Sequence, residues 1–254
     1  MNSISVGYRD TETFLGVDYR FPQAIFTHPS YNNESFDNAF AIVQLVNSST
    51  NEFVKLNTNP HKPGIAAPVT ALGAGGGGMS SNVLQQVQLV AMQTSECEAT
   101  RNRAGFPIVV SNSTLCASGG ELDVNGGFCE DDWGGPLILQ EGNNNTPSVG
   151  EQVQVGVISW TLGCASGAPG VFSRVSDAYD WIRSTLCAHS VAPPAYLACA
   201  TGLDVNNSQA LPIPAHNAPT SPISFQYEIG ADGYFYENGR SVNVIGCSSW
   251  FRLL

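Results

Sequence analysis

The sequence has few basic residues, and this shortage limits its partners. Ten lysines and arginines stand against 21 aspartates and glutamates in 254 residues, which gives a formal net charge of −11. Because nucleic-acid affinity rests largely on clustered Lys and Arg that neutralise phosphates, this balance argues against nucleic acid as a partner. No stretch approaches the roughly 20 consecutive apolar residues of a membrane-spanning helix, so we expect no membrane span.

Motifs for metal and cofactor binding are also missing. None of the seven cysteines forms a C-x-x-C pair, which argues against a zinc module and for disulfides, and disulfides need an oxidising compartment. The four consecutive glycines 75–78 lack the Lys and the helix that follow in a phosphate-binding loop. We therefore expect no metal and no cofactor.

The N-terminal segment MNSISVGYRD lacks a secretory signal, since no basic start is followed by an apolar run. Either the chain is incomplete at its start or it stays inside the cell. Five Asn-x-Ser/Thr sequons nevertheless lie in polar, turn-rich stretches where a glycan would be solvated, at Asn33, Asn47, Asn112, Asn144 and Asn206. Together with the cysteines they favour a secreted, extracellular glycoprotein.

The abundant residues favour an all-β fold. The chain has 26 glycines, 15 prolines and only 12% charged residues, which suits short strands joined by many turns. Residues 83–92 and 152–160 alternate apolar and polar side chains, as half-buried strands do. Residues 177–186 have apolar side chains at helical spacing, and Ser176 is the expected N-cap of that helix.

The composition changes after Cys187, which predicts a domain boundary. We expect a main domain over residues 1–187, a Pro-rich linker over 188–222 and a small β appendage over 223–254. Within the appendage, Asn238-Gly239 is the strongest hairpin signal of the chain.

Several segments, in order and spacing, resemble trypsin- and chymotrypsin-type serine proteases. They are HPSYN (28–32), DNAFAIVQL (37–45), CEDDWGGPL (129–137), VGVISWTLGC (155–164) and APGVFSRV (168–175), followed by a helix with DWI. In that family the third segment reads C-x-G-D-S-G-G-P. The resemblance covers residues 1–187 and implies a chymotrypsin-like double β-barrel, with the N-terminal barrel incomplete and a closing helix.

The resemblance also implies that the catalytic residues are lost. A serine protease needs a hydroxyl nucleophile, a histidine base and a carboxylate that orients the base. The nucleophile position is Trp133, and the carboxylate position is Ala39. Asp37 lies two residues away, roughly 6 to 7 Å along a strand, and is a poor substitute. The family's T-A-A-H-C segment is absent, and none of the four histidines has its context.

The neighbouring positions are altered as well. The first glycine of G-D-S-G is Asp131, whose negative charge would disfavour a developing oxyanion. Asp132 is retained, and we expect it to be a buried acid that is hydrogen-bonded locally, because an unpaired buried carboxylate is costly. We expect the Trp133 indole to fold across the specificity pocket between Trp160 and Thr161, because burial of an aromatic side chain is favourable.

The binding pocket survives in part. Its remnants, by resemblance, are Gly127 at the floor and Ser159, Trp160, Thr161 and Gly170 at the walls. Because trypsins carry aspartate at the floor, a preference for Lys or Arg has no charged anchor here.

The resemblance pairs four cysteines. Cys97 is expected to bond Cys116, and Cys129 to bond Cys164. Cys187, Cys199 and Cys247 have no reliable family counterpart, so one further bridge and one free thiol are expected, with the pair left open.

We therefore expect a catalytically inactive serine protease homologue that acts as a secreted binding or inhibitory protein, similar to the glucanase inhibitor proteins of oomycetes. Its expected partner is a protein, with an extracellular hydrolase as the candidate. Two alternatives stay open. One is an active serine endopeptidase whose missing upstream region restores the histidine. The other is a decayed fragment with no molecular role, because strands of the family's N-terminal barrel are absent.

Overall fold

The structure is a computed structural model. It describes residues 4–6, 18–49, 51–75, 80–103, 110–119, 132–141, 152–160, 168–199, 227–229, 235–237 and 240–242. The chain divides into two compact units, Met1–Ile182 with Ile245–Leu254, and Arg183–Val244. This division falls a few residues before the predicted boundary at 187, and the linker 188–222 and appendage 223–254 stay predictions.

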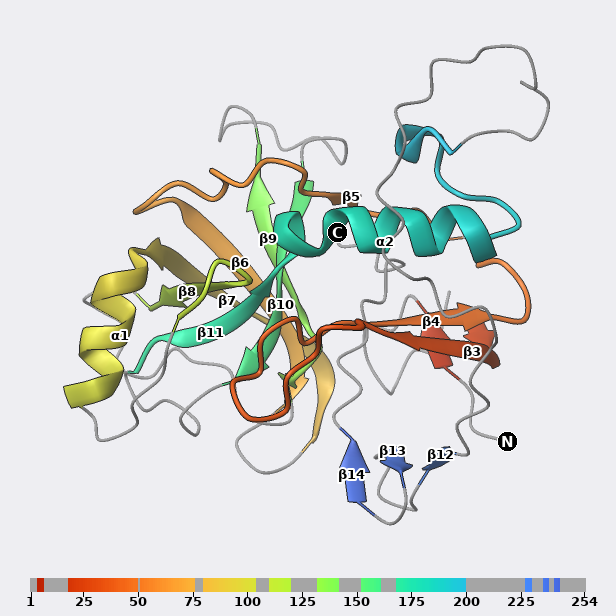
Figure 1. The fold of residues 1–254 in the computed structure, drawn as a ribbon, viewed down its shortest axis with the longest axis horizontal. Coiled ribbons are helices and arrows are strands. Elements are labelled where there is room, and N and C mark those ends of the chain that lie inside the picture. Colours follow the sequence, from red (N-terminus) through yellow and green to blue (C-terminus); the bar gives the residue numbers. More distant parts are fainter. Residues whose placement is uncertain are drawn as a thin grey trace. The chain divides into compact units, whose positions relative to one another are not determined.

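Six strands of the first unit form a closed antiparallel barrel (Figure 1). Its order is β11-β8-β7-β6-β9-β10, and β10 pairs back to β11. The strands are β6 (Pro68–Gly75), β7 (Ser80–Met92), β8 (Thr114–Ser118), β9 (Pro136–Gln140), β10 (Gln152–Trp160) and β11 (Gly170–Arg174). A short strand, β5 (Lys55–Leu56), adds to β10 in parallel. This barrel confirms the predicted all-β fold. Because the sheet closes on itself, none of its six strands has an unpaired edge.

The alternation of buried and exposed residues that the sequence predicts for β7 and β10 is present in only one of these two strands. In β7 the alternation is confirmed, since Leu89 and Ala91 are buried and Gln88 is exposed. In β10 it is wrong, because every residue from 153 to 159 is buried. The polar Gln154 is only 2% exposed, so its polarity does not mark a solvent-facing side. Strand β10 is therefore central, with both of its faces covered.

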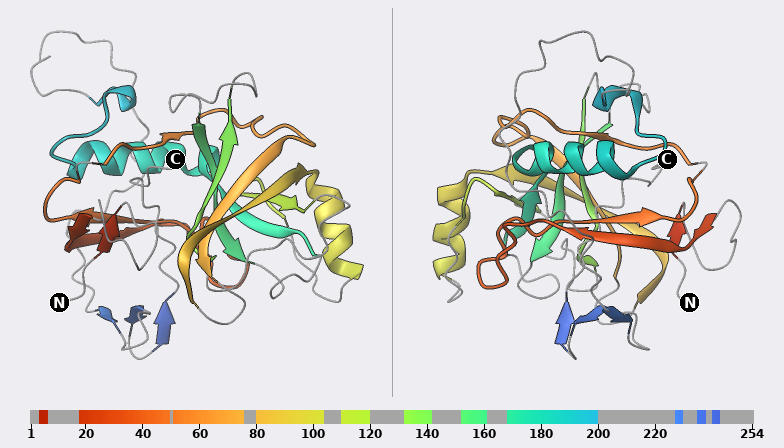
Figure 2. Two further views of the ribbon diagram at one scale, coloured as in Figure 1. Left: turned by 180° about the vertical axis from the view of Figure 1, so that it is seen from behind. Right: turned by 45° about the vertical axis from the view of Figure 1, so that its right-hand side comes forward.

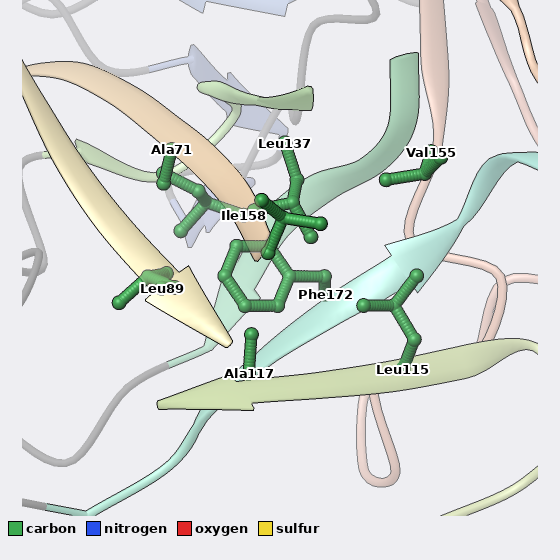
Figure 3. Close-up of a cluster of buried hydrophobic side chains, with 9 residues drawn as sticks. Ala71, Leu89, Leu115, Ala117, Leu137, Val155, Ile158 and Phe172 are labelled. Atoms are coloured by element: carbon green, nitrogen blue, oxygen red, sulfur yellow. The ribbon is translucent and has the colours of Figure 1, made fainter. Parts of the chain in front are cut away.

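The barrel core is one cluster of side chains contributed by all six strands (Figure 3). Its members are Val69, Ala71, Leu89, Leu115, Ala117, Leu137, Val155, Ile158 and Phe172. Gly156 makes room for the largest of them, since a Cβ there would lie 3.1 Å from Cβ of Phe172. Burial of such an aromatic ring contributes about 1.5–3 kcal/mol relative to exposure.

Residues before the barrel form two small sheets within the described part of the chain. Strand β1 (Ile4–Val6) pairs with β2 (Asp18–Arg20), and β3 (Pro22–Thr27) pairs with β4 (Ala41–Leu45). These described strands do not close into a second barrel. The expected incompleteness of the N-terminal barrel stays a prediction.

Along the chain, one helix lies between β7 and β8 and another follows β11. Helix α1 (Thr94–Arg103) lies beside β8 at one end of the barrel, as both views in Figure 2 show. Helix α2 (Val175–His189) confirms the predicted helix, with Ala178 and Ile182 buried. The predicted N-cap is wrong, because α2 begins at Val175 and places Ser176 inside the first turn.

The second unit is described in two parts. A 3-10 helix, η3 (Ala195–Leu197), follows α2, and Cys187 is bonded to Cys199. Farther along, β12 (Tyr227–Ile229), β13 (Phe235–Glu237) and β14 (Arg240–Val242) form a three-stranded sheet. Glu237 lies opposite Arg240, so the predicted hairpin signal falls between two paired strands.

Neither described helix has the length and hydrophobicity that a membrane crossing would need.

Candidate functional site

Residues 132–135, where the resemblance predicts the family's nucleophile, form a tight turn just before β9. Gly134 has a φ of 86°, a left-handed conformation that favours glycine. The Gly134 amide donates to the carbonyl of Ile158 at 2.9 Å, and the Ile158 amide donates to the carbonyl of Gly135 at 2.8 Å. Two backbone hydrogen bonds therefore fix the turn to β10.

Trp133, on this turn, packs against the core cluster of the barrel. Its indole nitrogen Nε1 is buried, and no group in the described part of the chain accepts a hydrogen bond from it. The indole is thus partly buried against the barrel core, whereas Trp160 packs against a separate cluster that includes Cys97, Cys116 and Val171. The predicted position of the indole between Trp160 and Thr161 stays a prediction. Thr161 lies outside the described residues.

Asp132 is buried, with 7% of its surface exposed. Its carboxylate occupies the space beside Gly73 of β6, where an added Cβ would lie 2.0 Å from Oδ1. The absence of a side chain at Gly73 is therefore what admits this acid. Local hydrogen bonding of Asp132 stays a prediction, and Asp131 lies outside the described residues.

Ala39, the predicted carboxylate position, is 2% exposed and belongs to the buried apolar residues. The nearby Asp37 is bound elsewhere. Its Oδ1 accepts hydrogen bonds from the hydroxyls of Ser111 and Ser113, and its Oδ2 accepts one from Ser35 at 2.9 Å. Burial alone would raise the pKa of Asp37, but these three hydroxyls outweigh it and hold the pKa below its ordinary value.

The described histidines have other surroundings. The ring of His28 packs edge-on against Trp181, with 4.8 Å between centroids. Its Nδ1 accepts the Ser30 amide at 3.2 Å, and burial lowers its pKa although Asp177 acts in the opposite direction. His61 and His189 are exposed, and His216 lies outside the described residues.

Three of the five predicted pocket residues are described. Ser159 and Gly170 are buried, and Trp160 is half-buried. The Trp160 ring stacks on Phe36, with 6.4 Å between centroids and 11° between planes. Gly127 and Thr161 lie outside the described residues.

Sequence analysis missed Arg101, which is part of this arrangement. Its guanidinium carbon lies 3.8 Å from the centroid of the Trp160 ring, and its side chain is completely buried. The available signal is its position four residues after Cys97 on one helix, which directs both side chains to the same face.

The disulfide Cys97–Cys116 is present, with 6.3 Å between Cα atoms. Cys187–Cys199 closes the bridge whose pair the sequence left open. Cys129, Cys164 and Cys247 lie outside the described residues. Of the sequon asparagines, Asn33, Asn47 and Asn112 are exposed, whereas Asn144 and Asn206 are not described. In the described ranges no group of three or more His, Cys, Asp or Glu could hold a metal ion.

A closed six-stranded barrel, a tight turn before β9 and a helix after β11 are the frame of a chymotrypsin-like serine protease domain. The sequence profile of the trypsin family matches residues 4–182, and the chain belongs to this family.

Curated relatives support this membership. The chain is 29% identical over 171 residues to Trypsin-1 of Salmo salar, which covers 65% of this chain and 63% of that protein. It is 28% identical over 172 residues to Cationic trypsin-3 of Rattus norvegicus, with 65% and 62% covered. It is 32% identical over 162 residues to Trypsin beta of Drosophila erecta, with 61% and 57% covered. The chain thus spans less than two thirds of the length of these relatives.

Proposed function

We propose that this trypsin-family chain is a pseudoprotease, which binds a protein partner and does not cleave peptide bonds. The observation that carries the proposal is Trp133, which lies at the predicted nucleophile position on a tight turn, with its partly buried indole packed against the barrel core. An indole has no nucleophilic oxygen, so no acyl-enzyme can form at this position.

The surrounding residues support the same proposal. Ala39 supplies no carboxylate, and Asp37 has its oxygens occupied by three serine hydroxyls. His28 packs against Trp181 and uses Nδ1 to accept a backbone amide. At the two expected triad positions within the described residues, Trp133 and Ala39 supply neither a nucleophile nor a carboxylate, and the nearby Asp37 and His28 are committed to other contacts.

The proposed setting is extracellular, and the proposed partner is a secreted hydrolase. The disulfides suit an oxidising compartment, and exposed sequon asparagines suit glycosylation. The stacked, half-exposed Phe36 and Trp160 provide aromatic contact area of the kind that is enriched in protein interfaces. The resemblance to glucanase inhibitor proteins makes an endo-β-glucanase the first partner to test.

Turnover assays test the loss of activity. The purified, disulfide-bonded chain is incubated with peptide and ester substrates that carry Arg, Phe or Glu before the scissile bond, beside a trypsin standard. We expect rates equal to those of buffer alone. Turnover that a phosphonofluoridate probe abolishes would contradict the proposal.

Binding is tested separately, by titrating a secreted endo-β-1,3-glucanase with the chain. The proposed partner class predicts saturable one-to-one inhibition or complex formation. A matched chain with Phe36→Ser and Trp160→Ser should bind at least about tenfold more weakly, because buried aromatic residues dominate interface energies. Absence of any complex would remove this partner class.

A further inference from the structure

Arg101 has buried N–H donors that no described residue satisfies. Arg101 lies on α1, and 0% of its surface is exposed. One nitrogen, Nη1, donates to the carbonyl of Pro169 at 2.6 Å. The guanidinium also lies over the Trp160 ring, 3.8 Å from its centroid.

The other two nitrogens, Nε and Nη2, are buried and have no hydrogen-bond partner among the described residues. These two groups lie on one edge of the planar guanidinium and direct their N–H bonds in parallel. That edge matches the two oxygens of a carboxylate in a bidentate pair. Since buried donors nearly always have partners, this edge has the form of one half of a recognition site.

The charge of Arg101 leads to the same conclusion. Burial lowers its pKa to about 10, so it remains a cation at neutral pH. The ion pairs between described residues are Arg20–Asp18 and Lys62–Glu141, and neither involves Arg101. A buried cation without a counter-charge is costly, so an anion that reaches it gains both a charge pair and two hydrogen bonds.

We propose that Arg101 anchors a carboxylate of a binding partner, either an acidic side chain or a chain terminus. The inference rests on the proposed function and names the chemistry of the partner at that same site. Arg101 contacts Trp160, a predicted wall position of the pocket, and the carbonyl of Pro169, the residue before a second predicted wall position, Gly170. The site therefore selects acidic ligands, the opposite of the Lys or Arg that an acidic pocket floor selects.

Trp160 is placed to report on binding at Arg101. The guanidinium is completely buried, so a carboxylate reaches its free edge only when a covering side chain moves, and the half-exposed Trp160 ring lies against the face of the same guanidinium. Pairing of a carboxylate with the guanidinium therefore changes the environment of Trp160. Tryptophan fluorescence therefore reports on binding, and the Trp160→Phe variant removes that signal.

Four blocked tripeptides test the proposal with the full chain. They are acetyl-Ala-Glu-Ala-amide, its Gln and Lys counterparts, and acetyl-Ala-Gln-Ala with a free C-terminal carboxylate. Dissociation constants come from NMR titration. We expect an acidic peptide to bind at least about tenfold more tightly than the neutral Gln amide, as expected for charge-assisted hydrogen bonds, and the Lys peptide not to bind. The Glu amide and the free C-terminus distinguish the two sources of the carboxylate.

Variants decide whether Arg101 is responsible. Arg101→Met should remove the preference for acidic over neutral peptides, and Arg101→Lys, which keeps a charge but lacks the bidentate edge, should weaken it about tenfold. Arg183→Met is the control, because that side chain donates to Leu197 and Ala198 in the second unit. If Arg101→Met does not fold, the preference of Arg101→Lys for acidic over neutral peptides decides whether Arg101 is responsible.

Three results would overturn the site: equal binding of Glu and Gln amides with no preference for the free C-terminus, a preference that survives Arg101→Met, or no saturable binding of either acidic probe at millimolar concentration. Cleavage of the Glu peptide would instead contradict the proposed function and leave the carboxylate site standing.

Discussion

Asp37 illustrates how hydrogen bonds commit a single carboxylate to a structural role. It lies two residues before Ala39, the predicted position of the family's carboxylate. The fold commits it to Ser35, Ser111 and Ser113, and the hydroxyls of the last two lie 2.8 Å apart. Its oxygens link the loop after β3 to the segment before β8, so its role is structural.

The Asp37→Asn variant tests that role through pH. The hydroxyl bonds lower the folded-state pKa, so the ionised group stabilises the fold above its unfolded pKa of about 3.9. That stabilisation is lost as pH falls through the folded-state pKa. We expect wild type to have the higher Tm at pH 6 and the gap between the two proteins to close below about pH 4.

Thermal unfolding between pH 2 and 7 measures this gap. The control is Asp180→Asn, which removes one exposed charge from α2. A gap for Asp37→Asn that stays constant down to pH 2, or that matches the control, would show that the serine cluster does not stabilise the ionised form.

At the scale of elements, strand β6 and the turn at 132–135 depend on small residues where they meet. A Cβ on Gly73 would lie 2.0 Å from Oδ1 and 2.8 Å from Cβ of Asp132, and a Cβ on Gly135 would lie 2.2 Å from the Leu72 carbonyl. The whole Asp132 side chain would have to move to admit one methyl group at position 73. Close packing of the turn on β6 therefore requires glycine at both positions.

Gly73→Ala should lower the free energy of unfolding by about 1–3 kcal/mol, the range for forced overpacking. Urea denaturation measures it. Gly64→Ala is the matched control, because its added Cβ meets nothing within 4 Å, and it should change stability by less than about 0.5 kcal/mol. Equal changes in the free energy of unfolding for the two variants would mean that the turn does not pack closely against Gly73 of β6.

Elements were predictable from sequence where periodicity carries the signal. The alternation in β7 and the helical spacing in α2 are local patterns, and both predictions are confirmed. The burial of β10 was mispredicted because the tertiary fold covers both of its faces, so Gln154 is buried despite its polarity. Arg101 was missed because its contacts with Trp160 and Pro169 join residues far apart in the chain.

At the scale of the whole molecule, each compact unit contains a disulfide among its described residues. Cys97–Cys116 ties α1 to β8 in the barrel unit, and Cys187–Cys199 links the end of α2 to the segment after η3 in the other. In the chain-entropy model, closing a loop of the first size stabilises a fold by about 3 kcal/mol. This contribution exists only in an oxidising compartment, which agrees with the proposed secretion.

Peptide mapping of secreted, non-reduced protein tests this organisation. We expect the two pairs above, together with Cys129–Cys164, and a free thiol at Cys247. The same map on protein that is reduced and alkylated first is the control. Free thiols at Cys97 and Cys116 in the secreted material would rule out both the pairing and the extracellular setting.

The most direct test of the account compares wild type with Trp133→Ser. This change restores a hydroxyl on the retained turn but removes an indole that packs against the core. We predict that Trp133→Ser lowers the free energy of unfolding by about 1.5–3 kcal/mol, because buried aromatic area is lost, and produces no peptide hydrolysis and no labelling by a serine-reactive phosphonofluoridate. Substrate turnover by the variant, with the probe bound at residue 133, would contradict the claim that this chain has no protease machinery left to restore.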